Sequence, residues 1–237
     1  MKNISEVVKF CCDRKALRFG NFTLKGGRKS PVFFNIFLTI NDGAGLAFMA
    51  KQYMALILEF LSDVVLKSDK TPDKIAQLQS KVFLFGPAYK GIPLAAITAD
   101  YLFKEKGLSF RWGYDRKEAK THGEKGGAEN PEALLDGDIR EGDLVVILDD
   151  VLTEGTAKME GIEKITAYAA AKKVKVTIAG ITTFIDRWEG GQELRKQYPV
   201  RACMRMDEVA KNAFTQKLIS QEDFDRYNSY IREFGLK

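Results

Sequence analysis

The sequence predicts an α/β fold built on a mainly parallel sheet, from two apolar segments and from the alternation of strand and helix patterns. Residues 82–85 and 145–148 are unbroken runs of valine, isoleucine, leucine and phenylalanine. A strand buried on both faces shows no polar alternation, and parallel sheets bury both faces of their strands. Helical patterns follow over 94–104 and 160–171, and a further strand is expected over 174–185, so strands and helices alternate as in βαβ units.

The composition is that of an ordinary globular enzyme. The chain has 237 residues, 45% of them hydrophobic and 29% charged, which suits a single domain over residues 1–237. No apolar run is long enough to span a bilayer and the first residues hold no signal-peptide core, so we expect no membrane partner. Cys11, Cys12 and Cys203 show no metal-binding or redox spacing, which indicates reduced thiols and a cytoplasmic location.

The net charge of +5 is a mild basic excess. Such an excess is compatible with nucleic acid as a partner, and equally with basic residues gathered around an anionic substrate. The local basic clusters described below favour the substrate, so no nucleic-acid partner is expected.

The first part of the chain predicts a helix and then a hairpin. Apolar residues at helical spacing from Ile4 to Cys11 indicate a short amphipathic helix that ends before Gly20. Residues 22–35 read as two short strands joined by a Gly-Gly turn, with basic side chains around the turn. By pattern alone, solvated basic residues explain this hairpin as well as a binding role does.

The next segments predict scaffold, with one residue at a ligand-binding edge. A long amphipathic helix is expected over 41–66, and the polar segment 67–80 reads as a surface insertion with a short helix over 72–79. The turn after the following strand places Lys90 at the carboxyl edge of the sheet, where it is either solvated or a partner of a diphosphate. Residues 110–114 predict a short edge strand.

The segment 115–127 is rich in basic residues and glycine and nearly free of apolar residues. Because it cannot pack a core, it is either a solvated charge run or a mobile lid that closes over an anionic substrate and excludes water. His122, the one histidine of the chain, lies on this segment.

The strand at 145–148 runs directly into Asp149 and Asp150, and a loop of threonine and glycine then leads into a helix. Open α/β sheets bind ligands at the carboxyl ends of their strands, and backbone N–H groups at a helix start suit phosphate. Carboxylates accept hydrogen bonds from ribose hydroxyls and can help to hold Mg²⁺. We therefore expect a phosphorylated sugar here, with both acids exposed at the strand end; an ordinary turn with a solvated acid pair is the alternative.

Arg187 also follows a predicted strand. Its planar guanidinium suits a carboxylate through two parallel hydrogen bonds. A surface pair between Asp186 and Arg187 is the simpler alternative. Residues 220–234 predict a polar helix that caps the domain.

Four motifs, in the order in which they occur here, resemble those of the orotate phosphoribosyltransferase family. They are Phe-Thr-Leu-Lys-Gly-Gly-Arg-Lys-Ser-Pro with the following Phe-Phe pair, the basic loop Arg-Lys-Glu-Ala-Lys-Thr-His-Gly-Glu, the acid pair with Thr-Glu-Gly-Thr, and Asp-Arg after a strand. Gly26 stands where the family usually has serine, and Lys125 lengthens the basic loop. The resemblance implies the type I phosphoribosyltransferase fold, a twisted, mainly parallel sheet flanked by helices. It also implies a small N-terminal β-hood, mainly from residues 20–40, over the base and a mobile lid over 113–128.

The resemblance implies transfer of the phosphoribosyl group from 5-phospho-α-D-ribose 1-diphosphate to orotate, which gives orotidine 5′-monophosphate and diphosphate in pyrimidine biosynthesis. It implies Mg²⁺ as the cofactor, held mainly by the substrate, with Asp149 and Asp150 nearby and no side chain assigned as a direct ligand. It implies a homodimer in which the lid reaches the neighbouring active site. We expect no second catalytic domain, such as a decarboxylase.

The same resemblance implies a role for each residue of these motifs and of the turn around Lys90. The residues implied in catalysis are Lys120, His122, Asp149 and Asp150. Those implied in binding orotate are Lys25, Phe33, Phe34, Thr153 and Arg187. Those implied in binding phosphoribosyl diphosphate are Lys25, Tyr89, Lys90, Arg116, Lys117, Lys120, His122, Asp149, Asp150, Val151, Leu152, Thr153, Glu154, Gly155, Thr156 and Ala157.

Two other functions fit part of the sequence. A regulator that senses phosphoribosyl diphosphate and binds nucleic acid would keep the acid pair and its loop, but it would not need the basic loop, and no recognition-helix domain is evident. A purine-specific enzyme of the same fold would not need Lys25 in the hairpin or Arg187.

Overall fold

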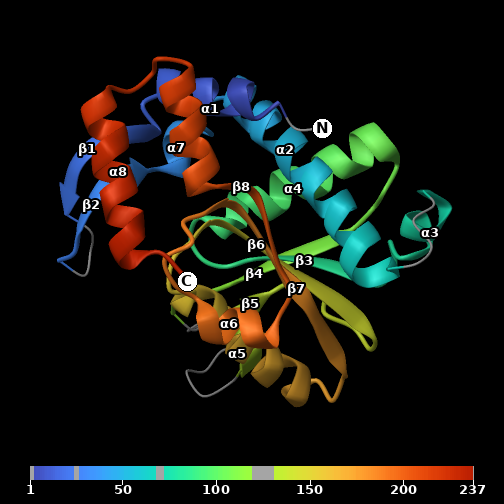
Figure 1. Ribbon diagram of the computed structural model, residues 1–237. Helices are drawn as coiled ribbons and strands as arrows, with labels where there is room; N and C mark the ends of the chain where they lie inside the picture. The colour runs from blue at the N-terminus through green and yellow to red at the C-terminus, as the bar shows by residue number, and fades with distance from the viewer. Residues whose placement is uncertain (1–2, 24–26, 68–71, 119–130, 237) are drawn as a thin grey trace.

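The computed structural model describes residues 3–23, 27–67, 72–118 and 131–236, and a six-stranded sheet runs through it (Figure 1). The strand order is β5-β4-β3-β6-β7-β8, and all neighbours are parallel except β5, which pairs antiparallel with β4 at one edge. The predicted mainly parallel sheet is therefore confirmed. The strands are β3 (Val82–Gly86), β4 (Arg111–Asp115), β5 (Leu135–Asp136), β6 (Asp143–Leu152), β7 (Val176–Asp186) and β8 (Val200–Arg205).

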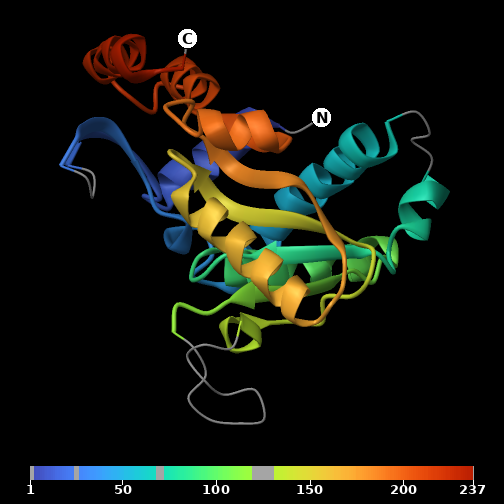
Figure 2. The ribbon, with the colours of Figure 1, turned by 90° about the horizontal axis from the view of Figure 1, so that it is seen from below.

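Helices cover both faces of the sheet (Figures 1 and 2). Successive side chains of a strand point to opposite faces, so a strand made only of apolar residues needs a helix on each face. In β3, Val82 and Leu84 belong to the core shared with α2 (Gly43–Phe60) and α4 (Gly91–Lys106). Phe83 and Phe85 belong to the core on the other face, under α5 (Thr156–Ala171). All four side chains are fully buried, which explains why the segment shows no polar alternation.

A two-stranded sheet lies beside the central sheet, and both ends of the chain contribute to its surroundings (Figure 1). The strands β1 (Leu17–Thr23) and β2 (Lys29–Phe34) pair antiparallel, so the predicted hairpin is present. The C-terminal helix α8 (Gln221–Phe234) packs against β2. We call β1, β2 and α8 together the hood. The remaining helices of this side, α1 (Ile4–Asp13) and α7 (Met206–Thr215), pack against each other.

Some predicted boundaries shift in the structure. The helix expected over 41–66 is α2 followed by η2 (Leu61–Leu66), where the hydrogen bonding changes to the wider π pattern. The strand expected at 110–114 is present as β4, but the prediction that it lies at the edge of the sheet is wrong, because the two-residue β5 pairs with its outer side. The first residues of the expected lid, 113–115, belong to β4. The other short elements are η1 (Ile36–Leu38), α3 (Pro72–Gln77), η3 (Pro131–Leu134) and α6 (Gln192–Gln197).

One helical segment of the described chain, 43–66, is long and apolar enough to cross a bilayer by length and composition. Its residues Met49, Tyr53 and Ile57 are fully buried in the core against the sheet, as in the core helix of a globular protein. The hydroxyl of Tyr53 donates to the main-chain oxygen of Asp149 at 2.8 Å. The helix therefore supports the end of β6, where the predicted acid pair lies.

Candidate active site

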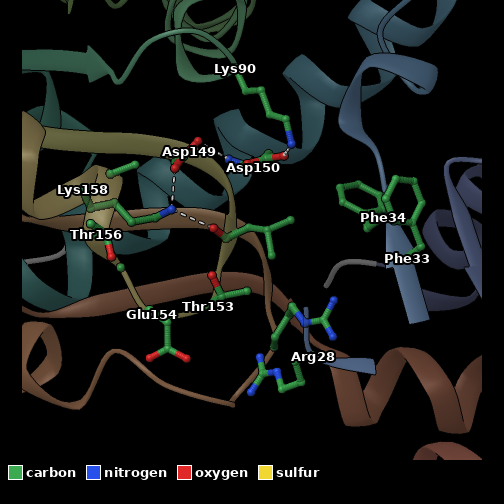
Figure 3. Close-up of a pocket in the computed structure, with 14 residues that line it drawn as sticks. Arg28, Phe33, Phe34, Lys90, Asp149, Asp150, Thr153, Glu154, Thr156 and Lys158 are labelled. Carbon is green, nitrogen blue, oxygen red and sulfur yellow. Dashed lines mark hydrogen bonds and ion pairs between the residues drawn. The ribbon is translucent and has the colours of Figure 1, made fainter. Parts of the chain in front are cut away.

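A cavity of about 880 Å³ opens at the carboxyl ends of β6 and β7, between the loop that starts α5 and the hood (Figure 3). It brings together most residues predicted to bind the two substrates. Those lining it are Phe33, Phe34, Lys90, Asp149, Asp150, Val151, Thr153, Glu154, Gly155, Thr156, Ala157 and Arg187. Two residues that the sequence analysis did not assign, Arg28 and Lys158, line it as well.

Asp149 and Asp150 lie within β6 rather than beyond its end. Because β7 pairs with β6 as far as Leu152, the sheet extends past both acids, which are only 7% and 5% exposed. The expectation of two exposed acids is therefore wrong, and so is the alternative of a solvated acid pair.

Each acid is paired with its own lysine (Figure 3). Lys90 donates from Nζ to Oδ2 of Asp150 at 2.8 Å. Lys158 is paired with Oδ2 of Asp149 and donates to the main-chain oxygen of Val151 at 2.7 Å. Burial, and next the negative charge of Asp149, raise the pKa of Asp150 above its usual range, while the two lysines oppose this rise. The two acids and two lysines form a charge-balanced cluster.

Lys158 was missed because the sequence does not show that its side chain is buried. It is the third residue of α5, and its side chain is 4% exposed. A positive charge in the first turn of a helix opposes the helix dipole. A lysine at this place was therefore a signal, present in the sequence, that a carboxylate lies near the start of the helix.

The loop between β6 and α5 has the geometry expected of an anion site. Gly155 caps the helix with a φ of 87°, a left-handed conformation that glycine adopts without strain, and among the described residues no side chain caps the first N–H groups. The N–H group of Lys158 donates to the main-chain oxygen of Gly155 at 3.0 Å, and those of Thr156 and Ala157 point toward the positive end of the helix, where an anion binds. Leu152 does not line the cavity but is fully buried in the core under α5.

The loop between β3 and α4 is held close to β6. A Cβ on Gly91 would lie 2.7 Å from the main-chain oxygen of Leu148 in β6, so this close approach requires glycine. The carboxylate of Asp115 accepts a hydrogen bond from the N–H of Ala88 at 2.6 Å, and the Ala88–Tyr89 peptide bond is cis. Lys90 reaches Asp150, whereas Tyr89 is 67% exposed and does not line the cavity.

Arg187 lies on the opposite wall, between β7 and the hood, and is 4% exposed. The alternative of a surface pair with Asp186 is wrong, since Asp186 is buried and accepts from Arg195 at 2.7 and 2.8 Å. Arg187 is bonded instead to Glu189, at 2.8 Å from Nη2. Glu189 is a third residue that the sequence analysis did not assign.

The other predicted residues lie away from the cavity or outside the described part of the chain. Arg116 is paired with Asp136 and Lys117 with Glu160, and neither basic residue lines the cavity. The residues Lys25, Lys120 and His122 lie outside the described residues.

The acidic side chains do not make a metal cage. Within residues 3–23, 27–67, 72–118 and 131–236, no three histidine, cysteine, aspartate or glutamate side chains are grouped so that they could hold a metal ion. Asp149 and Asp150 already have lysine partners. This donor set fits a metal ion that arrives with phosphate oxygens as its ligands, as Mg²⁺ commonly does.

Comparison with known sequences gives matches over nearly the whole chain. The family described as "Phosphoribosyl transferase domain" matches residues 66–213, which include both acids and their loop. Orotate phosphoribosyltransferase from Acinetobacter baumannii (strain AB307-0294) is 38% identical, over 97% of this chain and 94% of the relative. The enzyme of that name from Pseudomonas fluorescens (strain SBW25) is 37% identical, over 98% of this chain and 97% of the relative.

Solved structures give the same result for the fold. The crystal structure of orotate phosphoribosyltransferase from Francisella tularensis has a TM-score of 0.71 and 28% identity, over 100% of this chain and 98% of that chain. UMP synthase from Leishmania donovani has a TM-score of 0.70 at 21% identity, and this chain covers 43% of it. The second match shows the fold alone.

Proposed function

We infer how the cavity works from one premise: this chain belongs to the orotate phosphoribosyltransferase family. It transfers the phosphoribosyl group of 5-phospho-α-D-ribose 1-diphosphate to orotate, with release of diphosphate, in pyrimidine biosynthesis. One observation supports the assignment of roles to residues. A single cavity is lined by an uncapped helix start, a buried acid pair and a buried arginine, which suit a phosphate, a ribose and a carboxylate in turn.

The loop of residues 153–157 binds the 5-phosphate in this proposal. The N–H groups at the start of α5 donate to the phosphate oxygens, and the hydroxyls of Thr153 and Thr156 add donors. Val151, Glu154 and Ala157 complete the wall. Glu154 is exposed, so its carboxylate remains in solvent and does not need to face the phosphate.

Asp149 and Asp150 orient the ribose. In the described part of the chain, the side-chain bonds of Asp150 reach only Oδ2, which leaves Oδ1 to accept a ribose hydroxyl. Lys158 fixes Asp149 in position, because the two side chains form a buried ion pair and Lys158 also donates to the main-chain oxygen of Val151. The acids thus hold the sugar with its C1 toward the base, and this positioning lowers the entropic cost of the transfer.

Lys90 and the lid residues neutralise the leaving diphosphate. The side chain of Lys90 is 44% exposed, so it can move from Asp150 to a diphosphate oxygen. Arg116, Lys117, Lys120 and His122 add positive charge from the lid, and Tyr89 and Lys25 add contacts to the diphosphate sugar. Mg²⁺, when bound by the substrate, would supply Lewis-acid stabilisation of the leaving diphosphate.

Arg187 recognises the orotate carboxylate, and the hood residues Phe33 and Phe34 cover the ring, with Lys25 and Thr153 beside it. Phe34 is buried and stacks on Phe184 with ring centroids 5.7 Å apart, which fixes the main chain of the hood at this place. These contacts would restrict the orientation of the base before the transfer.

The decisive assay is loss of orotate absorbance after phosphoribosyl diphosphate and Mg²⁺ are added, with uracil and hypoxanthine as control bases. Rapid loss with orotate and little reaction with either control is expected. Preference for hypoxanthine, or no reaction with any base, would contradict the assigned base specificity.

The dimer and the shared site belong to the same proposal, together with a cytoplasmic location. Arg116 and Lys117 do not line the cavity of their own chain, which is compatible with a lid that serves a neighbour. Lys120→Ala protein is mixed with Asp150→Asn protein after subunit exchange. If lids act across the two-fold axis, half of randomly paired dimers are hybrids and about a quarter of all sites regain full function. If proven exchange restores nothing, the shared site is wrong.

A further inference from the structure

A single buried carboxylate, that of Glu189, joins the base side of the cavity to the C-terminal helix. Its side chain is 0% exposed. Oε1 accepts a hydrogen bond from Nε of Arg187 at 2.9 Å and forms an ion pair with Nη2 of the same guanidinium at 2.8 Å. Oε2 accepts from Nη2 of Arg28 at 2.8 Å and from the hydroxyl of Tyr230 at 2.9 Å. The end of β7, the hairpin and α8 therefore meet on one side chain.

These bonds determine which donors of Arg187 remain for a substrate. Nε and Nη2 are occupied by Glu189, and Nη2 also donates to Oγ of Ser30 at 2.8 Å. Nη1 has only a long contact of 3.4 Å to the main-chain oxygen of Val32. Arg187 thus offers one nitrogen to the cavity, and the two parallel hydrogen bonds expected from its sequence position need a second donor group.

Arg28 is that second group. It lines the cavity, its side chain is 28% exposed, and among the described residues its only hydrogen bond is the one from Nη2 to Glu189. Its guanidinium lies 5.9 Å from the ring centroid of Tyr230 and 5.4 Å from that of Phe234. Cation–π contacts of this kind hold a guanidinium in one place, so α8 supports Arg28 as well as Glu189.

The charges of this cluster leave a positive excess. Two arginines share one carboxylate, which gives a net charge of +1 at a largely buried place. An uncompensated buried charge is costly. A pyrimidine that carries a carboxylate neutralises this positive charge when it binds, whereas an uncharged pyrimidine does not.

We propose that Glu189 is the positioning residue of the base site, which holds Arg187 and Arg28 together as a clamp for the base carboxylate, and that Tyr230 of α8 fixes Glu189. The inference rests on the proposed role of Arg187. It adds Arg28 as a substrate contact and makes the C-terminal helix a determinant of base affinity.

Two tyrosines of α8 provide a matched test. Tyr230→Phe removes the hydroxyl that donates to Glu189, while Tyr227→Phe removes a buried hydroxyl that has no partner in the described structure. We expect Tyr230→Phe to raise the KM for orotate about three- to tenfold, since a hydrogen bond to a charged group is lost. The KM for phosphoribosyl diphosphate should stay the same, and Tyr227→Phe should change neither constant. Equal orotate KM values for the two folded variants would overturn the proposal.

Two further variants test the clamp itself. Glu189→Gln keeps the shape but places an amide against a guanidinium, and Arg28→Gln removes the second cation. Each should raise the KM for orotate on the order of tenfold or more, with little change for phosphoribosyl diphosphate. If Glu189→Gln does not fold, Arg28→Gln and Tyr230→Phe still decide the question. An unchanged orotate KM in Arg28→Gln overturns the clamp, whereas wild-type protein that does not use orotate at all contradicts the proposed function instead.

Discussion

The two walls of the cavity both hold buried carboxylates against cations, but they differ in charge and in the origin of their residues. On the strand side, Asp149 and Asp150 face Lys158 and Lys90, so acids and bases balance. On the hood side, Glu189 alone faces Arg28 and Arg187, so one positive charge remains. The difference matches the two ligands, because a ribose brings hydroxyls to the balanced wall and orotate brings an anion to the positive wall.

The strand wall also depends on the charge pair for its stability, which gives the largest predicted effect. Asp149→Asn leaves the ammonium of Lys158 buried without its partner, and we expect a loss of about 3 kcal/mol in the free energy of unfolding together with a loss of activity. Adding Lys158→Met removes the unpaired charge, so the double variant should regain stability in urea unfolding without regaining activity. If the double variant is as unstable as the single one, the pair is not the source of the effect.

The hood wall should respond in binding. Arg187→Ala removes one half of the positive wall, and we expect it to weaken orotate capture by roughly 2–5 kcal/mol with much less change for phosphoribosyl diphosphate. Arg111→Ala is the control, because Arg111 pairs with the buried Asp143 at 2.9 Å from Nη1 and does not line the cavity. The control should lose stability but keep its orotate KM. An orotate KM and kcat/KM that are unchanged in Arg187→Ala would contradict the assignment of the positive hood wall to the orotate carboxylate.

The loop between the walls gives a smaller effect that two glycines can separate. Gly155 and Gly142 have φ values of 87° and 77°, and alanine at either place costs about 1 kcal/mol of stability. A Cβ at Gly155 would also lie 3.0 Å from Leu194, whereas none of the described atoms lies within 4 Å of one at Gly142. Only Gly155→Ala should raise the KM for phosphoribosyl diphosphate. Equal effects on KM would mean that the loop does not bind the phosphate through its main chain.

The smallest effect concerns pH and the strand wall. Burial raises the pKa of Asp150, and Lys90 opposes this rise. Lys90→Met should therefore raise the pKa further and move the acid limb of kcat/KM for phosphoribosyl diphosphate to higher pH. The same raised pKa also affects the free energy of unfolding. An acid with a lowered pKa stabilises the fold as pH rises, whereas Asp150, with a raised pKa, destabilises it. Because the pKa is higher in the folded state than the usual 3.8, ionising Asp150 costs stability as pH rises through the folded value. A limb at the same pH in both proteins would mean that Asp150 does not control it.

The acid pair and the loop of the strand wall could be predicted from the sequence, because they are neighbours in the chain, although the burial of the acids and the role of Lys158 could not. The apolar run, the two acids and the loop of residues 153–157 occupy one strand, turn and helix start. Such a segment is governed by short-range rules, namely strand burial, the sterics of glycine and the exposed N–H groups of a helix start. The sheet type followed from the same local patterns, and the family motifs supplied the substrates.

The depth of the acids, and the cluster that Glu189 forms on the hood wall, depended on tertiary packing. The pairing of β7 beyond Asp150 buries both acids, and no pattern within β6 reports how far a neighbouring strand continues. Glu189 gathers Arg28 and Tyr230 across sequence separations of 161 and 41 residues. Whether such distant side chains meet depends on how the hairpin and the last helix pack against the sheet. The positive charge that Arg28 and Arg187 have in excess over Glu189 becomes costly only when this packing has excluded water from it.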